Sequence, residues 1–240
     1  MTIALLAQLA LLIPLGTAAL FVIVPWLRRT GMPAAVISVC AATASLVCAV
    51  ILFVTQLRFP DSVVIASGPW LPHAGGALAD VGVRVDGISS SMALIVTFVA
   101  WAVQVFSIGY MSHEEKPALG RYFTYHSLFI FSMLALVFAP NMLQFFFGWE
   151  LVGLTSYLLI GFYYQKPSAA RAAVKAFWMT KAADMGLLLG VILLFAYTGG
   201  FAWTADISPE HATVVTVLLF IGVMGKSAQF PLHVWLPDAM

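Results

Sequence analysis

Long apolar runs recur along this chain, and about 20 apolar residues in a helix cross the hydrocarbon core of a bilayer. The segments that meet or approach this length are residues 3–27, 33–57, 88–111, 122–139, 141–163, 172–197 and 212–229. Only 9% of the 240 residues are charged and 62% are hydrophobic, whereas about a quarter of a soluble domain is charged. The sequence therefore predicts an all-α integral membrane protein, a bundle of about seven transmembrane helices.

The longest link between the predicted spans runs from Arg58 to Gly87. Within it, Val81–Gly87 (VGVRVDG) alternates apolar and polar residues, which is typical of a strand, and Pro72–Gly76 (PHAGG) has the composition of a turn. We therefore expect a short β-hairpin outside the bilayer, with an irregular loop as the alternative. The chain then divides into N-terminal transmembrane helices, the hairpin or loop, and a second helical region: residues 1–57, 58–87 and 88–240.

Basic residues in the links predict which side of the membrane each link faces. Seven lysines and arginines lie in one alternating set of links: Arg28, Arg29, Lys116, Arg121, Lys166, Arg171 and Lys175. The other set holds Arg58 and Arg84. Because cytoplasmic loops carry the excess of basic residues, we expect the N-terminus and the hairpin to be extracytoplasmic.

Four ionisable residues lie inside the predicted spans: Glu150, Lys181, Asp184 and Lys226. A charge at the centre of a membrane helix costs about 2.5–3.5 kcal/mol on insertion scales, so such residues usually pair and face a protein interior or a wet cavity. We expect Glu150 and Lys226 to be partners, or neighbours along one path. Lys181 and Asp184 are three residues apart and share a helix face, so we expect them to pair with each other and to face Glu150. The alternative is that these groups only hold helices together.

The last segment predicts a broken seventh helix. Pro231 follows Lys226 by five residues, and a proline inside a helix removes one backbone hydrogen bond and clashes with the preceding turn. A broken helix at membrane depth is tolerated where it is buried in protein or lines a wet cavity. His233 and Asp238 follow, and each is a candidate proton carrier or a residue of the inner interface.

Other side chains in the spans have a simpler interpretation. His126 is expected to be a hydrogen-bonded helix contact, with a proton relay as the alternative. Trp149 and Trp235 are interpreted as packing residues, and Cys40 and Cys48, which share one apolar run, as buried packing residues.

The chain lacks a Walker loop, a G-x-G-x-x-G turn and a C-x-x-C pair. We therefore expect no nucleotide, flavin, iron–sulfur or metal site in it. The sequence has no basic patch, so we expect no nucleic-acid partner. A row of titratable groups in apolar surroundings remains, and lysine suits such a row because burial readily lowers its proton affinity.

Three stretches resemble a known family: FFFGWELVGLTSYLLIGFYY (145–164), ARAAVKAFWMTKAADMGLLLG (170–190) and GKSAQFPLHVWLPDAM (225–240). They are similar to membrane subunits of proton-pumping NADH:quinone oxidoreductase, respiratory complex I, which belong to the Mrp-type cation/proton antiporter family. The first stretch favours the L-type member of this family. The likeness runs from about Val81 to Met240.

The resemblance implies that Glu150 is the family's essential glutamate, Lys226 the lysine of the broken helix and Asp184 the acidic residue of the sixth helix. With Lys181, and more weakly His233, they would translocate protons. Where the family usually has arginine, this chain has Lys181, and lysine can release a proton where arginine cannot. Because family members are far longer, we expect an N-terminal fragment whose residues 88–240 hold a truncated first half-channel.

The resemblance also implies a non-redox subunit of a translocase. Quinone reduction would occur in partner subunits that hold NADH, FMN, iron–sulfur clusters and quinone. The expected partners are other membrane subunits of complex I, the lipid bilayer and protons, in a bacterial plasma membrane or, as the alternative, an organellar inner membrane. The other functions left open are a related cation/proton antiporter, a hydrogenase-linked subunit, an inorganic-carbon-uptake subunit and a structural scaffold.

Overall fold

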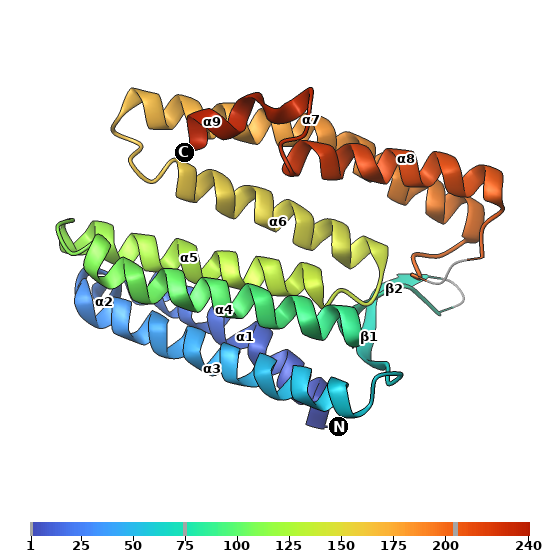
Figure 1. Ribbon diagram of the computed structural model, residues 1–240, viewed down its shortest axis with the longest axis horizontal. Helices are drawn as coiled ribbons and strands as arrows, with labels where there is room; N and C mark the ends of the chain where they lie inside the picture. Colours follow the sequence, from blue (N-terminus) through green and yellow to red (C-terminus); the bar gives the residue numbers. More distant parts are fainter. Residues whose placement is uncertain (1, 74–75, 204–205) are drawn as a thin grey trace. The chain divides into compact units, whose positions relative to one another are not determined.

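The computed structural model describes residues 2–73, 76–203 and 206–240, and these are mostly helical (Figure 1). The longer elements, in chain order, are α1 (Thr2–Ile23), α3 (Met32–Arg58), β1 (Val64–His73), β2 (Gly76–Val85), α4 (Gly87–Tyr110), α5 (Lys116–Val137), α6 (Met142–Ile160), α7 (Pro167–Thr198) and α8 (Pro209–Lys226). The short helices are α2 (Pro25–Arg29), η1 (Leu232–Trp235) and α9 (Leu236–Ala239).

Within these described ranges, five helices are long and apolar enough to cross a membrane: α1, α3, α4, α6 and α7. The prediction of a helical membrane protein is therefore confirmed at this level. The remaining two predicted spans also form helices, α5 and α8, but polar and charged residues lower their hydropathy. Lys116 and Arg121 lie in α5, and Glu210 and Lys226 lie in α8.

The predicted hairpin is present as a two-stranded antiparallel sheet of β1 and β2. Its alternation works as expected, because Val83 and Val85 are buried while Arg84 between them is partly exposed. At Gly82 a side chain would overlap the carbonyl of Ala66, so only glycine lets the strands approach here. The predicted turn is only partly visible, since residues 74 and 75 lie outside the described ranges.

The chain forms two compact units. The first comprises Met1–Gly68 and Gly82–Ala139, and the second comprises Pro69–Val81 and Pro140–Met240. In the first unit, α3 packs against α1 and α4, and small side chains such as Ala10, Ala42 and Ala93 are buried there. Small residues let membrane helices approach closely.

A polar network joins α3, α4 and α5 inside the first unit. The hydroxyl of Ser38 donates to Oε1 of Gln104 (3.2 Å) and lies 2.7 Å from the hydroxyl of Ser127. Nε2 of Gln104 lies 3.2 Å from Nδ1 of His126. His126 is therefore a hydrogen-bonded helix contact, as expected.

Glycines bring α7 and α8 together in the second unit, where the two helices run side by side (Figure 1). A side chain on Gly186 would meet Ile221 at 2.9 Å, and one on Gly222 would meet Leu187 at 2.8 Å. At Gly225 an added Cβ would overlap that of Ala183. Helix α7 ends at Thr198, and the capping residue that follows, Gly199, has a positive φ of 71° that suits a glycine.

Helix α8 ends at Lys226, and the chain turns before η1 begins at Leu232. The turn includes Ala228 at a positive φ of 50°. The indole N–H of Trp235 donates to the carbonyl of Gly225 (3.0 Å). Trp235 therefore satisfies a carbonyl at the end of α8, a role that its interpretation as a packing residue missed.

Candidate functional site

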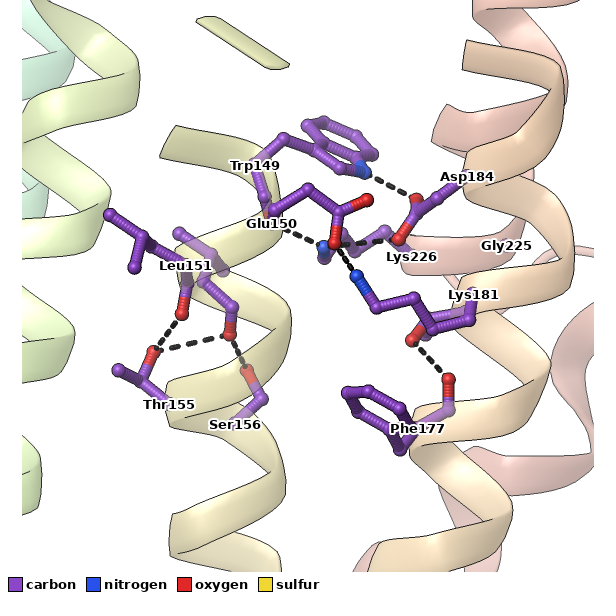
Figure 2. Close-up of polar contacts among 12 residues, drawn as sticks. Trp149, Glu150, Leu151, Thr155, Ser156, Phe177, Lys181, Asp184, Gly225 and Lys226 are labelled. Carbon is purple, nitrogen blue, oxygen red and sulfur yellow. Dashed lines mark hydrogen bonds and ion pairs between the residues drawn. The ribbon is translucent and has the colours of Figure 1, made fainter. Parts of the chain in front are cut away.

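Three helices of the second unit bring the four predicted ionisable residues together. Glu150 projects from the middle of α6, and Lys181 and Asp184 lie one turn apart on α7. Lys226 is the last residue of α8. Figure 2 shows their side chains converging between the helices. We call these four residues the charge cluster.

The ion pairs of the charge cluster differ from the expected ones. Glu150 contacts Lys181 through Oε2 and Nζ, and Nζ of Lys226 lies 3.8 Å from Oδ2 of Asp184 (Figure 2). The ion pairs found within the described ranges include neither Glu150 with Lys226 nor Lys181 with Asp184. Both pairs join neighbouring helices, because the long lysine side chains reach across to carboxylates on α6 and α7.

Trp149 is a member of the site that sequence reasoning missed. Its indole N–H donates to Oδ1 of Asp184 at 2.5 Å, and its backbone carbonyl accepts from Nζ of Lys226 at 2.6 Å. The same ammonium lies 4.8 Å from the centre of the indole ring, within the range of a cation–π interaction. The sequence feature that could have identified Trp149 is its position next to Glu150, because this places the backbone of Trp149 at the level of the charged groups.

Burial is uneven within the charge cluster. The side chain of Asp184 is 3% exposed and that of Lys226 is 16% exposed, against 22% for Glu150 and 30% for Lys181. The Asp184–Lys226 pair is therefore the more deeply buried of the two. Charges interact more strongly where water is excluded.

Two small features make room for Lys226 and leave Asp184 incompletely bonded. A Cβ at Gly153 would lie 3.1 Å from Nζ of Lys226, so a glycine on α6 accommodates the ammonium. Oδ2 of Asp184 is buried and has no hydrogen-bond partner within the described ranges. Buried polar atoms without hydrogen-bond partners are rare in native proteins, so this oxygen distinguishes Asp184 within the cluster.

His233 and Asp238 lie away from the charge cluster. His233 is exposed in η1 and stacks on Phe230, with ring centres 5.9 Å apart. Asp238 forms an exposed ion pair with Lys175 at 2.6 Å. The geometry gives these residues no contact with Lys226 in the part of the chain that the structure describes.

The site is built from side-chain acids, amines and an indole. Within residues 2–73, 76–203 and 206–240, no three His, Cys, Asp or Glu residues are grouped to hold a metal ion. Both cysteines are free. The interpretation of Cys40 as buried was wrong, since it lies on the exposed surface of α3, where a lipid-facing position is compatible with an apolar thiol.

These features define a multi-pass membrane protein with a partly buried charge cluster. Residues 139–240 match the family described as NADH:quinone oxidoreductase/Mrp antiporter, TM. Residues 70–123 match the family described as NADH-Ubiquinone oxidoreductase (complex I), chain 5 N-terminus. The chain belongs to this complex I and Mrp antiporter-like family, and residues 139–240 include the whole charge cluster.

Relatives of known assignment agree with this placement. The chain is 48% identical over 189 residues to NADH-quinone oxidoreductase subunit L of Neisseria meningitidis. The match covers 71% of this chain and 28% of that protein. It is 38% identical to F(420)H(2) dehydrogenase subunit L of Methanosarcina mazei, over 98% of this chain and 38% of that protein. The chain thus spans well under half the length of these relatives.

The fold also matches a solved structure. The Mrp complex from Dietzia sp. DQ12-45-1b contains a chain that is 28% identical, with a TM-score of 0.79. The match covers 97% of this chain and 25% of that chain. This chain therefore shares its fold with a chain of that Mrp complex.

Proposed function

We propose that this chain translocates protons as a membrane subunit of an NADH:quinone oxidoreductase. The observation that carries the proposal is the charge cluster, in which two lysines and two carboxylates from three helices form two adjacent ion pairs. Ionisable residues inside a membrane bundle mark proton and ion pathways. The 48% identity to subunit L of such an enzyme supports this choice of complex.

In this proposal a proton resides on Nζ of Lys226. Asp184 and the carbonyl of Trp149 hold the ammonium. Lys181, held by Glu150, lies close enough to act on Lys226 electrostatically. When Lys181 leaves Glu150 and approaches Asp184, its positive charge weakens the hold on the proton of Lys226, which then passes on.

The finer architecture belongs to the same proposal. Helices α5 and α8 join the five candidate spans to make seven, and α8 with η1 and α9 forms the broken seventh helix beside Lys226. The complex lies in a bacterial plasma membrane, with an organellar inner membrane as the alternative. Other membrane subunits contact this chain, and NADH, FMN, iron–sulfur clusters and quinone bind to partner subunits.

A related cation/proton antiporter subunit is the second candidate function. The 28% identity and TM-score of 0.79 to a chain of the Mrp complex favour it. In that case Na⁺ or another cation would exchange for protons through the same charge cluster.

Lys226→Met tests the proposed function in membrane vesicles that contain the full-length protein in its complex. The pH gradient formed on NADH oxidation is measured, and the amount of assembled complex is checked in parallel. We expect at least a tenfold loss of proton translocation, and no loss in the control Lys175→Met, which removes an exposed lysine of α7. Normal translocation by Lys226→Met contradicts the proposal. Translocation that needs Na⁺ and not NADH favours the antiporter.

A further inference from the structure

We infer that Trp149 is a positioning residue that holds Asp184 and Lys226 apart and so keeps the proton of Lys226 transferable. The inference rests on the proposed function and adds to it a residue that is neither acid nor base. Trp149 contacts both members of the more deeply buried pair, and it does so with different atoms.

The first step concerns Asp184. One carboxylate oxygen, Oδ1, accepts the indole N–H of Trp149 at 2.5 Å. The other, Oδ2, faces Lys226 at 3.8 Å, which exceeds a hydrogen bond. The indole therefore fixes the rotation of the carboxylate and keeps Oδ2 from closing on the ammonium.

The second step concerns Lys226. Its ammonium donates to the carbonyl of Trp149 at 2.6 Å and lies 4.8 Å from the ring centre. The backbone and ring of Trp149 thus draw Nζ toward α6, away from Asp184 on α7. Trp149 gives each member of the pair one hydrogen-bond partner, and the direct contact between Asp184 and Lys226 stays long.

The charged groups around the pair come from three helices. Asp184 on α7 is faced by Lys226 from α8 and by Lys181 one turn earlier on its own helix. Glu150 on α6 holds Lys181. Lys181 is held by Glu150 and Lys226 is charged, so substituting either lysine changes the net charge of the site. The indole of Trp149 is a neighbour of Asp184 that a single substitution removes without such a change.

Trp149→Phe is the test, because it removes the N–H and keeps an aromatic ring and the backbone carbonyl. The freed carboxylate turns toward Lys226, and the tighter pair holds its proton more firmly. We expect proton translocation per complex to fall about tenfold. We also expect its pH profile to move to higher pH by about one unit, the equivalent of that factor. The matched control is Trp178→Phe, because Trp178 on α7 is 69% exposed.

Asp184→Asn separates positioning from packing. Losing the counter-charge moves the profile to lower pH, opposite to Trp149→Phe. The double variant behaves like Asp184→Asn alone, because the indole then has no carboxylate to hold. If Trp149→Phe matches Trp178→Phe, moves the profile the other way, or adds its full loss to that of Asp184→Asn, the inference is overturned.

Two further arms keep the outcome interpretable. If Trp149→Phe lowers the amount of assembled complex, benzothienylalanine is placed at position 149 instead. It replaces only the N–H by sulfur in a ring of the same shape, and the same shift of the pH profile to higher pH is expected. Lys226→Met is measured alongside. Loss of translocation in Lys226→Met with an unchanged profile for both position-149 variants overturns the inference alone. Normal translocation in Lys226→Met overturns the proposed function as well.

Discussion

Each ammonium of the charge cluster faces one carboxylate, and each pair joins two helices. Lys181 crosses from α7 to Glu150 on α6, and Lys226 lies between α6 and Asp184 on α7. Breaking one pair leaves a buried charge uncompensated, which costs about 3–5 kcal/mol when one partner of a buried pair is removed. The two pairs are neighbours, so a change in one alters the electrostatic surroundings of the other.

Substitutions at Lys181 distinguish a charge that balances Glu150 from a group that itself releases protons. Arginine keeps the charge and the ion pair but cannot lose a proton. Because Lys181 is held by Glu150, we expect Lys181→Arg to keep most proton translocation and Lys181→Met to lose it. The pH gradient per NADH oxidised is the measurement. Failure of the Arg variant at normal assembly would instead make Lys181 a relay.

At the residue scale, the sequence identified all four members of the charge cluster but not their partners. An ionisable residue in an apolar run is visible in the sequence, and its cost in the membrane marks it as a residue that pairs or serves function. Which carboxylate each lysine contacts depends on how the three helices are rotated and how far apart they lie. The positions of residues along a single helix do not predict this. Trp149 was missed because an indole in an apolar run is ordinarily a packing residue.

At the element scale, α7 and α8 are held close by glycines, and this closeness carries Lys226 to the other charges. Gly186 and Gly222 accept side chains from the facing helix, and Gly225 meets Ala183. The small residues were visible in the sequence. The identity of the partner helix was not visible, because glycine or alanine occurs in each of the long helices.

Gly225→Ala tests this packing. The new methyl group overlaps the Cβ of Ala183, so α8 must move away from α7, at a cost of about 1–3 kcal/mol. We expect a lower thermal unfolding temperature of the purified complex and weaker proton translocation. Gly16→Ala in α1 is the control, since nothing lies within 4 Å of its added Cβ. Equal unfolding temperatures in the two variants would contradict the account of α7–α8 packing.

Asp86 begins α4 with a capping box. Its carboxylate accepts the backbone N–H of Ser89 at 2.8 Å, and the hydroxyl of Ser89 accepts the backbone N–H of Asp86 at 2.7 Å. Burial alone raises the pKa of Asp86, but the hydrogen bonds from Ser89 and the guanidinium of Arg84 outweigh it. The pKa therefore lies below its ordinary value.

The lowered pKa of Asp86 fixes the direction of a pH effect. The stabilisation by its charge is complete above the unfolded-state pKa of about 4 and is lost as pH falls through the lower folded-state pKa. We expect Asp86→Asn, which keeps a cap but removes the charge, to unfold at a lower temperature than the parent at neutral pH. The difference should shrink in acid. A difference that grows below pH 4 would rule out this linkage.

At the scale of the whole molecule, two helical units share one hairpin along the chain. Helix content and the hairpin followed from the sequence because apolar runs and strand alternation are local patterns. The division into units did not, since it arises from contacts between residues far apart in sequence. Hydropathy also separated the five strongest spans only weakly from α5 and α8, whose polar residues serve contacts inside the protein.

Orientation in the membrane is a prediction for the whole molecule, based on seven basic residues in one set of links and two in the other. With Cys40 and Cys48 replaced by serine, a cysteine at exposed Ser168 should react only with reagent on the cytoplasmic side. A cysteine at exposed Asp61 should react only from the opposite side. Reversed labelling would invert the topology and any direction of proton flow derived from it.

Glu150→Gln in the full-length protein, measured as the pH gradient formed per NADH oxidised in membrane vesicles, tests the central claim most directly. Glutamine keeps the volume and the hydrogen-bonding capacity but removes the charge that holds Lys181. The account predicts normal assembly with proton translocation lost, and a milder loss for Glu150→Asp, which keeps the charge and shortens its reach. A Glu150→Gln complex that assembles and translocates protons like the parent would contradict the claim and leave Glu150 as a contact between helices.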